Sequence, residues 1–280
     1  MTPDPDRLRC LAFQLDAAGV SNATRRDAHV DRVVDAVHAA VDRAGGVDLV
    51  LLPELSTVDY SAAAFDALAE LAEPLDGPSV ARFAALARAL DATVVFGMPR
   101  VDAHGRYFIA QVAVDATGHP LGHNDKVHIA QIGASAEKRW FHRGSQGLAF
   151  EVRGWRLGVV ICYDMRFPTY LSRLVNRHAL DAVLHPVAFT RDGSWPSWHA
   201  FVQTRAMEHQ VYWLSLNRAG TDWGHSLLCP PWVDETTRPL AFDARESSEV
   251  IELSRTALAE ARTQYPFRQD ALSDYSSVVP

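Results

Sequence analysis

Apolar residues recur along the chain with two periods, one typical of helices and one typical of buried strands. Between residues 24 and 43, valines follow one another at helical spacing and form one stripe, at Val30, Val33, Val34, Val37 and Val41. Similar patterns predict further helices at residues 62–71, 79–90, 168–177 and 197–210. Short apolar runs predict strands at residues 8–15, 92–98, 107–114, 147–152, 156–161, 182–186, 212–217, 226–230 and 250–253. This alternation indicates a layered α/β fold, but periodicity alone cannot order the strands.

One of these apolar runs ends at a reactive side chain. Residues 157–161 carry no polar side chain, which is typical of a strand covered on both faces, and Cys162 follows them directly. Pro168 is suited to the first position of a helix, because its ring fixes φ and it has no N–H to satisfy. We therefore expect a strand, a turn and a helix, with the Cys162 thiolate stabilised by free N–H groups near the helix start. The alternative is a buried structural cysteine, which behaves as a small hydrophobe.

Two more predicted strands end in charged residues. The apolar run 49–52 is followed by a proline, which interrupts strand pairing, and then by Glu54. The short extended segment 118–125 is followed by Lys126. Taken alone, each charged residue is most simply a solvated cap at a strand end. Together with Cys162 they supply a base, a cation and a thiol, each at the end of a strand.

Over residues 8–253 the chain resembles the nitrilase superfamily, the carbon–nitrogen hydrolases that use a Glu-Lys-Cys triad. The resemblance rests on six segments in the family's order, namely Leu52-Pro53-Glu54, Asp125-Lys126-Val127-His128, Glu137 upstream of Trp140 and Gly144, Cys162-Tyr163-Asp164, Arg205-Ala206-Met207-Glu208 and Asn217-Arg218-Ala219-Gly220. It implies a four-layer α-β-β-α sandwich, an α/β fold in which two sheets pack face to face between layers of helices.

The resemblance also implies a role for each of these polar residues. Glu54 would take the proton of Cys162, later return it to the leaving ammonia, and then activate water against a thioester. Lys126 and the backbone N–H of Tyr163 would stabilise the oxyanion that forms on the substrate. Glu137 would position the substrate or Lys126, or assist the base. Because its carboxylate would lie near that of Glu54, protonation of one of these two groups is favoured.

The residues after the thiol point to a substrate class. Residues 162–168 read Cys-Tyr-Asp-Met-Arg-Phe-Pro and are similar to the omega-amidase and deaminated-glutathione amidase branches, whereas nitrilases proper usually follow the cysteine with tryptophan and glutamate. The resemblance therefore implies a small linear amide as substrate, an ω-amide with a free carboxylate. Arg166 or Arg191 would bind that carboxylate in a bidentate pair, and Phe189 and Trp195 are expected at the pocket mouth.

Other interpretations of these residues stay open. A structural ion pair of Arg166 with Asp164 or Glu208 explains this arginine as well as substrate binding does. The same triad is compatible with an N-carbamoyl-amine hydrolase or a nitrilase. The same fold is compatible with a catalytically silent ligand-binding protein, which has no chemical need to keep the triad.

Three histidines, His119, His123 and His128, lie close together in the sequence. One of them is a candidate base for a papain-like Cys-His pair. Their spacing, without cysteine or paired carboxylates beside them, argues against a metal site. We expect neither a metal nor another cofactor.

Composition limits the choice of partners and compartment. The 280 residues carry a formal net charge of −7 with dispersed basic residues, which argues against nucleic acid as a partner. The three cysteines, Cys10, Cys162 and Cys229, are odd in number and widely spaced, unlike a disulfide framework. The sequence contains neither a secretory signal nor an apolar run of about 18 residues. We therefore expect a soluble cytoplasmic protein that does not associate with membranes.

No linker, repeat or low-complexity segment divides the chain. We expect one carbon–nitrogen hydrolase domain over residues 1–262 and a tail over residues 263–280 without helix or strand periodicity. Either the tail packs on a partner subunit, as the resemblance implies, or it is loose. The resemblance further implies a homo-oligomer, either a dimer or a multiple of dimers.

Overall fold

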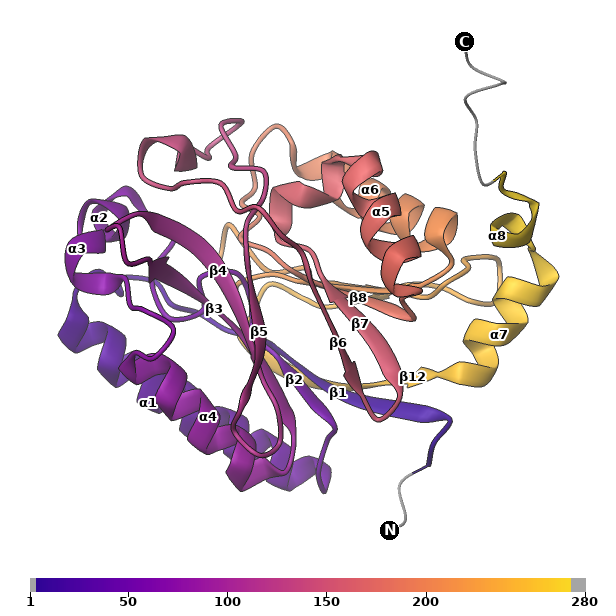
Figure 1. Ribbon diagram of the computed structural model, residues 1–280, viewed down its shortest axis with the longest axis horizontal. Coiled ribbons are helices and arrows are strands. Elements are labelled where there is room, and N and C mark those ends of the chain that lie inside the picture. The colour runs from indigo at the N-terminus through magenta and orange to yellow at the C-terminus, as the bar shows by residue number, and fades with distance from the viewer. Residues whose placement is uncertain (1–3, 273–280) are drawn as a thin grey trace.

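Two six-stranded sheets packed face to face form the centre of the computed structural model, which describes residues 4–272 (Figure 1). The first sheet has the strand order β12-β1-β2-β3-β4-β5. Its strands are β1 (Arg7–Gln14), β2 (Leu49–Leu51), β3 (Thr93–Val101), β4 (Tyr107–Val114), β5 (Pro120–Asp125) and β12 (Ser247–Ser254). Strands β1, β2 and β3 are parallel, and antiparallel pairing adds the other three.

The second sheet repeats this plan with the order β11-β10-β9-β8-β7-β6. Its strands are β6 (Leu148–Val152), β7 (Trp155–Val159), β8 (Ala182–Pro186), β9 (Tyr212–Leu216), β10 (Leu227–Cys229) and β11 (Leu240–Ala241). Here β7, β8 and β9 are parallel, and β6 and β10 pair antiparallel at their flanks. In each sheet, therefore, the parallel strands direct their carboxyl ends to one edge, where side chains from different strands can meet.

Helices cover the outer face of each sheet (Figure 1). The first sheet is covered by α1 (Ala23–Ala44) and α4 (Pro78–Leu90), the second by α5 (Pro168–His178) and α6 (Trp195–His209). The valine stripe of α1 is buried against α4 and the first sheet. A second core takes residues from both sheets and continues to the helices over the second sheet, with Leu171 of α5 and Trp198 of α6. Burial of each such side chain contributes roughly 1.5–3 kcal/mol, and the four layers follow from these two cores.

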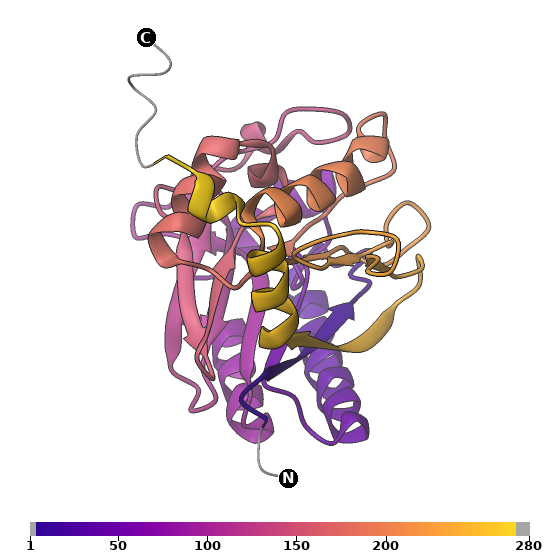
Figure 2. The same ribbon diagram turned by 90° about the vertical axis from the view of Figure 1, so that its right-hand side faces the viewer.

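The remaining elements are short or lie near the C-terminus. They are α2 (Ala62–Asp66), α3 (Leu68–Leu71), the 3-10 helices η1 (Glu137–Arg139) and η2 (Cys162–Arg166), α7 (Arg255–Gln264) and α8 (Phe267–Asp270). Figure 2 shows α7 and α8 in yellow at the end of the molecule that faces the viewer. Arg262 of α7 donates from Nη2 to the carbonyl of Leu180 at 2.8 Å, so α7 packs on the chain's own second sheet.

The four-layer α-β-β-α sandwich predicted from the resemblance is confirmed, and every strand and all but one of the helices predicted from periodicity are present. Two predictions need correction. The helix expected over residues 62–71 is interrupted at Ala67, whose ψ of 16° is not helical, which separates α2 from α3. The segment from residue 263 was expected to lack helix, but it contains the end of α7 and all of α8.

This C-terminal segment is anchored by its own contacts. The ring of Tyr265 stacks on Trp232 with 3.7 Å between centroids, and Nε2 of Gln210 donates to the carbonyl of Ala261 at 3.2 Å. Residues 273–280 of the predicted tail lie outside the described residues, so its packing on a partner subunit stays a prediction. Among the helices of residues 4–272, none has the length and apolar character that crossing a membrane requires.

The centre of β3 contacts the loop after β2 too closely to admit a side chain. A Cβ on Gly97 would lie 2.5 Å from the amide nitrogen of Leu55 and 2.6 Å from the carbonyl oxygen of Pro53. We therefore expect Gly97→Ala to lower the free energy of unfolding by about 1–3 kcal/mol, because backbone atoms would have to move. Thermal and urea unfolding followed by circular dichroism would measure this loss.

Gly193→Ala is the matched control. A Cβ at Gly193 meets no atom within 4 Å, so this variant should unfold at the wild-type temperature. Equal unfolding midpoints for the two variants would show that the loop after β2 yields without cost, contrary to this expectation.

Candidate active site

A buried cluster of four polar side chains lies where the two sheets meet. Glu54 follows β2, Lys126 follows β5, Glu137 belongs to η1 and Cys162 begins η2. Nζ of Lys126 donates to Oε1 of Glu54 at 2.8 Å and to Oε1 of Glu137 at 2.6 Å. The Cys162 thiol lies close enough to Glu54 to lower the pKa of that carboxyl group. The structure thus brings together all three members of the predicted triad and the predicted supporting glutamate.

The cluster is closed to solvent. Lys126 and both glutamates have no exposed surface, and Cys162 is 7% exposed. The alternative that Glu54 and Lys126 are solvated caps at strand ends is therefore excluded. Charged groups tolerate such burial only when they are paired and hydrogen-bonded, as they are here.

Glu54 and the loop that carries it are held by contacts from two loops of the second sheet. The second carboxylate oxygen of Glu54, Oε2, accepts a hydrogen bond from the Ala188 N–H at 2.7 Å. The next residue, Leu55, has a φ of 50°, in the left-handed region that side chains rarely adopt. Buried Arg218 donates from Nη1 to the carbonyls of Leu55 and Val58 at 3.0 and 2.9 Å. This arginine of the Asn-Arg-Ala-Gly segment therefore fixes the loop that presents Glu54.

Glu137 holds Lys126 with help from a tyrosine. Its Oε1 accepts from the hydroxyl of Tyr60 at 2.6 Å, and its Oε2 accepts from the Ala130 N–H at 2.8 Å. The Tyr60 hydroxyl also contacts Oγ of Ser135 at 3.1 Å. Tyr60 is a residue of the site that was not predicted from the sequence. Its position in the loop after Glu54 was the only signal available.

Cys162 is presented by a strained turn. The strand β7 ends at Val159, and the Val160 N–H still donates to the carbonyl of Leu184 on β8 at 3.0 Å. Cys162 itself has a φ of 42°, a conformation that costs roughly 1–2 kcal/mol for a residue with a side chain. The 3-10 helix η2 follows, and then α5 begins at Pro168 as predicted. The thiol therefore lies where the chain leaves the sheet.

The charges of the cluster act on one another in low dielectric. Burial raises the pKa of Glu54, and so does the negative charge of Glu137. The positive charge of Lys126 lowers it, but the net shift of the Glu54 pKa is upward. Burial alone would lower the pKa of Lys126, but the two carboxylates raise it well above its ordinary value. Lys126 thus stays charged, and Glu54 binds a proton more readily than an exposed glutamate.

The thiol behaves differently from the sequence-based expectation. Burial and then the charge of Glu54 raise the pKa of Cys162 well above its ordinary value, which outweighs the lowering by Lys126. The prediction that free N–H groups near a helix start stabilise the thiolate is therefore wrong, because burial and the neighbouring carboxylate dominate. The raised pKa favours a neutral thiol, which lies beside a carboxyl group that accepts protons readily.

A small cavity of about 20 Å³ opens beside the thiol, which is space for about one water molecule. It is lined by Ala130, Ile132, Ser135, Cys162, Tyr163, Arg166, Ala188, Phe189, Thr190, Asp192 and Ser194. Four predicted site residues, Cys162, Tyr163, Arg166 and Phe189, are among them. Any ligand larger than water therefore requires some of these lining groups to move.

Arg166 is the cation of the cavity wall. Its Nη2 donates to Oγ of Ser197 at 2.9 Å, and its guanidinium lies 4.8 Å from the ring centroid of Phe201. The alternative of an ion pair with Asp164 or Glu208 is wrong, because those carboxylates pair with His128 and Arg205 respectively. Nε of Arg166 is buried and makes no hydrogen bond to the described residues. The guanidinium therefore has capacity left for a ligand.

Arg191 and Trp195 do not line the cavity, contrary to prediction. Nη2 of Arg191 donates to Nε2 of His225 at 2.6 Å, and its guanidinium lies 5.2 Å from the ring centroid of Trp195. Trp195 in turn packs edge-on against Phe189. Trp195 therefore contacts the lining residue Phe189 and not the cavity itself, and Arg191 contacts Trp195.

One carboxylate ties together the two loops that cover the cavity. Oδ2 of Asp192 accepts from the Ala134 N–H at 2.9 Å, and Oδ1 accepts from the Ser194 N–H at 2.7 Å. Gly133 makes this contact sterically feasible, because a Cβ there would lie 1.9 Å from Oδ2 of Asp192. The loops before η1 and before α6 are thus fastened over Cys162.

The predicted histidine cluster does not gather around the thiol. Nδ1 of His128 lies 2.7 Å from Oδ1 of buried Asp164, His123 contacts Asp125 and His119 contacts Thr117. The histidine nearest the nucleophile is His185, with Nε2 3.0 Å from the carbonyl oxygen of Cys162. Within residues 4–272, no three histidine, cysteine or carboxylate side chains are grouped to hold a metal.

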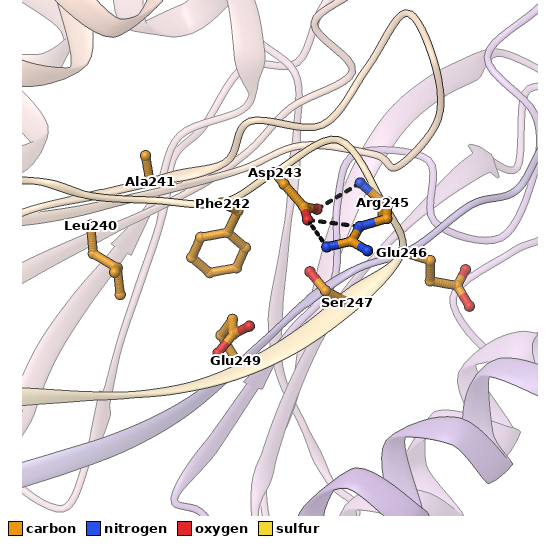
Figure 3. Close-up of a pocket in the computed structure, with 8 residues that line it drawn as sticks. All are labelled: Leu240, Ala241, Phe242, Asp243, Arg245, Glu246, Ser247 and Glu249. Carbon is orange, nitrogen blue, oxygen red and sulfur yellow. Dashed lines mark hydrogen bonds and ion pairs between the residues drawn. The ribbon is translucent and has the colours of Figure 1, made fainter.

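A wider groove of about 400 Å³ lies on another part of the surface (Figure 3). It is lined by Leu240, Ala241, Phe242, Asp243, Arg245, Glu246, Ser247 and Glu249. Figure 3 shows the Arg245 guanidinium turned toward Asp243, and these two groups lie 2.6 Å apart. The groove contains none of the buried cluster, so its larger size does not make it the reactive site.

Comparison with known proteins agrees with this geometry. The family model described as carbon-nitrogen hydrolase matches residues 12–244. A protein of Pseudomonas protegens named hydrolase in pqqF 5'region is 31% identical and covers 84% of this chain and 81% of its own. The omega-amidase NIT2 of Homo sapiens is 26% identical over 97% of both chains. In structure, Nit3 of Saccharomyces cerevisiae, a member of branch 10 of the nitrilase superfamily, has a TM-score of 0.81 at 22% identity and covers 95% of this chain and 97% of its own.

The charge of Glu54 is one cause of the raised pKa of Cys162. Removing it in Glu54→Gln should lower the pKa of the thiol, because Lys126 remains beside it while one negative charge is lost. We therefore expect the pH profile of Cys162 alkylation by iodoacetamide to move to lower pH. Intact-protein mass spectrometry over a pH series would measure the rate.

Cys162→Ala is the control for this titration, since it reports any background from buried Cys10 and Cys229. A profile that moves to higher pH in Glu54→Gln would contradict the electrostatic account. It would mean that Glu54, as a proton acceptor, facilitates loss of the thiol proton more than its charge opposes it.

Proposed function

Because this chain belongs to the carbon–nitrogen hydrolase family, we propose that it is a cysteine-dependent amidohydrolase that cleaves a small linear amide through a thioester intermediate. The observation that supports this best is the buried cluster in which Lys126 donates a hydrogen bond to Glu54 and the Cys162 thiol lies beside that carboxyl group. A nucleophile, a proton acceptor and a cation are thereby in contact before any substrate binds. The family's amidase relatives support amide hydrolysis as the reaction class.

Acylation begins with the neutral thiol. Sγ of Cys162 attacks the carbonyl carbon while its proton passes to Glu54, and the carbonyl oxygen becomes an oxyanion. An ammonium group has three N–H donors, and Lys126 gives two of them to Glu54 and Glu137. Its third N–H and the backbone N–H of Tyr163 are the proposed oxyanion donors.

Collapse of the tetrahedral intermediate then breaks the carbon–nitrogen bond. Glu54 returns its proton to the departing nitrogen, so ammonia leaves and the acyl group remains on Sγ as a thioester. In the second half, the Glu54 carboxylate removes a proton from water as the water oxygen attacks the thioester carbon. That proton passes to the departing sulfur, which restores the thiol and releases the carboxylic acid product.

The supporting residues act through Lys126. Glu137 accepts hydrogen bonds from Lys126, Tyr60 and the Ala130 N–H. These contacts fix the ammonium group between the two carboxylates, so its orientation is settled before the oxyanion forms. We assign Glu137 and Tyr60 to this positioning role.

The substrate we propose is an ω-amide with a free carboxylate. The cavity wall contains a guanidinium, that of Arg166, whose buried Nε makes no hydrogen bond to the described residues. A carboxylate at the far end of the substrate would satisfy it through a charge-assisted hydrogen bond. An N-carbamoyl-amine or a nitrile remains the alternative substrate for the same triad.

Other sequence-based expectations stay predictions. They are a cytoplasmic location, a homo-oligomer built from dimers, and the absence of nucleic-acid and membrane partners. None of them enters the chemistry proposed for the buried cluster.

The first test is ammonia release from a panel of neutral amides, ω-amides with a carboxylate, N-carbamoyl-amines and nitriles. We expect the wild-type protein to release ammonia from amides and Cys162→Ala to release none, because the thioester cannot form. Intact-protein mass spectrometry of rapidly quenched samples should show the acyl group on the wild-type protein alone.

Circular dichroism should show that Cys162→Ala keeps the wild-type fold. Cys162-dependent release from nitriles or carbamoyl compounds but not from amides would replace the proposed substrate class. Absence of ammonia across the panel would instead favour the silent ligand-binding protein.

Substrate selection is tested by Arg166→Met, which keeps the length of the side chain but removes its charge. We expect kcat/KM for ω-amides with a carboxylate to fall about 10- to 100-fold, the cost of losing a hydrogen bond to a charged group. Neutral amides of the same length should be hydrolysed at the wild-type rate. Arg173→Met, on the exposed face of α5, is the control, and an equal loss for both amide classes in Arg166→Met would argue against carboxylate binding.

A further inference from the structure

The main chain of Cys162 is bonded to a buried histidine from the neighbouring strand. His185 belongs to β8, has no exposed surface, and places Nε2 3.0 Å from the carbonyl oxygen of Cys162. A carbonyl oxygen can only accept a hydrogen bond, so Nε2 carries the hydrogen in this contact. The sequence motifs of the family resemblance gave no reason to single out this residue.

The contact is made where β7 leaves the sheet. Val159 pairs with Leu184 in parallel register, and the Val160 N–H still bonds the Leu184 carbonyl. Beyond that point the chain turns, and Cys162 adopts its φ of 42°. A residue with a side chain keeps such a conformation only where its surroundings impose it. At this position the hydrogen bond to the Cys162 carbonyl comes from the His185 side chain and not from a backbone N–H of the neighbouring strand.

The same stretch of chain also contacts the base. The Ala188 N–H, three residues beyond His185, donates to Oε2 of Glu54 at 2.7 Å. The segment 185–188 therefore contacts both the nucleophile's backbone and the carboxylate that takes its proton. Its position sets where these groups lie relative to each other.

His185 is neutral in this environment. Burial lowers its pKa to about 3, the charge of Lys126 acts in the same direction, and the bond to Cys162 opposes both. Protonation therefore begins only well below neutral pH, and the ring does not form a stable imidazolium during turnover. Its Nδ1 makes no hydrogen bond to the described residues, which also argues against a relay to a carboxylate.

We propose that His185 is a positioning residue for the hydrolase reaction, which holds Cys162 in its left-handed conformation through the bond from Nε2 to the Cys162 carbonyl. This inference rests on the proposed function, because it assigns His185 a role in that same site. It differs from a papain-like Cys-His pair, in which the histidine would bond to the sulfur and take its proton.

Two substitutions separate hydrogen bonding from packing. His185→Phe keeps an aromatic ring of similar size but has no donor, whereas His185→Gln loses the ring and keeps an N–H that can reach the position of Nε2. We expect His185→Phe to lower kcat about 10- to 100-fold with KM little changed, as for a misplaced nucleophile. His185→Gln should retain kcat within a few-fold of wild type, with the same pH profile.

The alkylation rate of Cys162 by iodoacetamide should follow the same order, slower in His185→Phe and near wild type in His185→Gln. This second readout needs no substrate, so it still tests the inference if the wild type hydrolyses no amide and the proposed function fails. His209→Phe is the matched control. It replaces another buried histidine, at the end of α6, and should leave both rates per folded molecule unchanged.

The reverse order, with His185→Phe active and His185→Gln impaired, would overturn the proposal and assign His185 to packing alone. Equal loss in both variants, together with loss of a limb of the pH profile between pH 5 and 8, would overturn it in favour of a histidine base. Unfolding temperatures measured in parallel distinguish a lower rate per folded molecule from a smaller folded fraction.

Discussion

The structure depends on one buried cation between two buried carboxylates. Removing Lys126, Glu54 and Glu137 from water is costly, and loss of one partner of such a group typically costs about 3–5 kcal/mol. Each charge here is matched by short hydrogen bonds of 2.6 to 2.8 Å. Because Glu54 and Lys126 follow strands of the first sheet and Cys162 follows a strand of the second, the cluster exists only when the two sheets pack at the correct distance and register.

Two residues in left-handed conformations, Leu55 and Cys162, flank this cluster. Both are held by side chains from the second sheet or the loop that follows it, Arg218 at the carbonyl of Leu55 and His185 at that of Cys162. The backbone strain thus lies next to the base Glu54 and at the nucleophile Cys162. Contacts from the rest of the fold maintain these strained conformations. Loss of either hydrogen bond would therefore affect both the stability of the fold and the position of the reactive groups. Both bonds are accepted by backbone carbonyls, which no sequence motif identifies.

The sequence predicted the reactive groups better than their surroundings. Glu54 and Cys162 were found because each follows an apolar run, Lys126 because it follows a short extended segment, and the resemblance joined the three into a triad. The Ala188 N–H could not be found, since any residue has a backbone donor, and Tyr60 and His185 meet the site only through contacts distant in sequence. Arg191 and Trp195 were misplaced because local sequence does not determine which loop side chains face a cavity. Helix α7 was missed because its buried residues, Leu258 and Ala261, form too narrow an apolar stripe.

The raised pKa of Cys162 has a consequence for how this site can react. If Cys162 were a thiolate, its negative charge would lie beside that of Glu54. The two charges would repel each other strongly in the low dielectric of the interior. In the proposed attack, proton transfer from sulfur neutralises Glu54 as the negative charge appears on the substrate oxygen, next to the same ammonium group. The cluster holds two negative charges and one positive charge before and after this step, so no further ion is removed from water. A neutral resting thiol is therefore consistent with a fast reaction, provided that the carbonyl lies within reach of Lys126 when the proton moves.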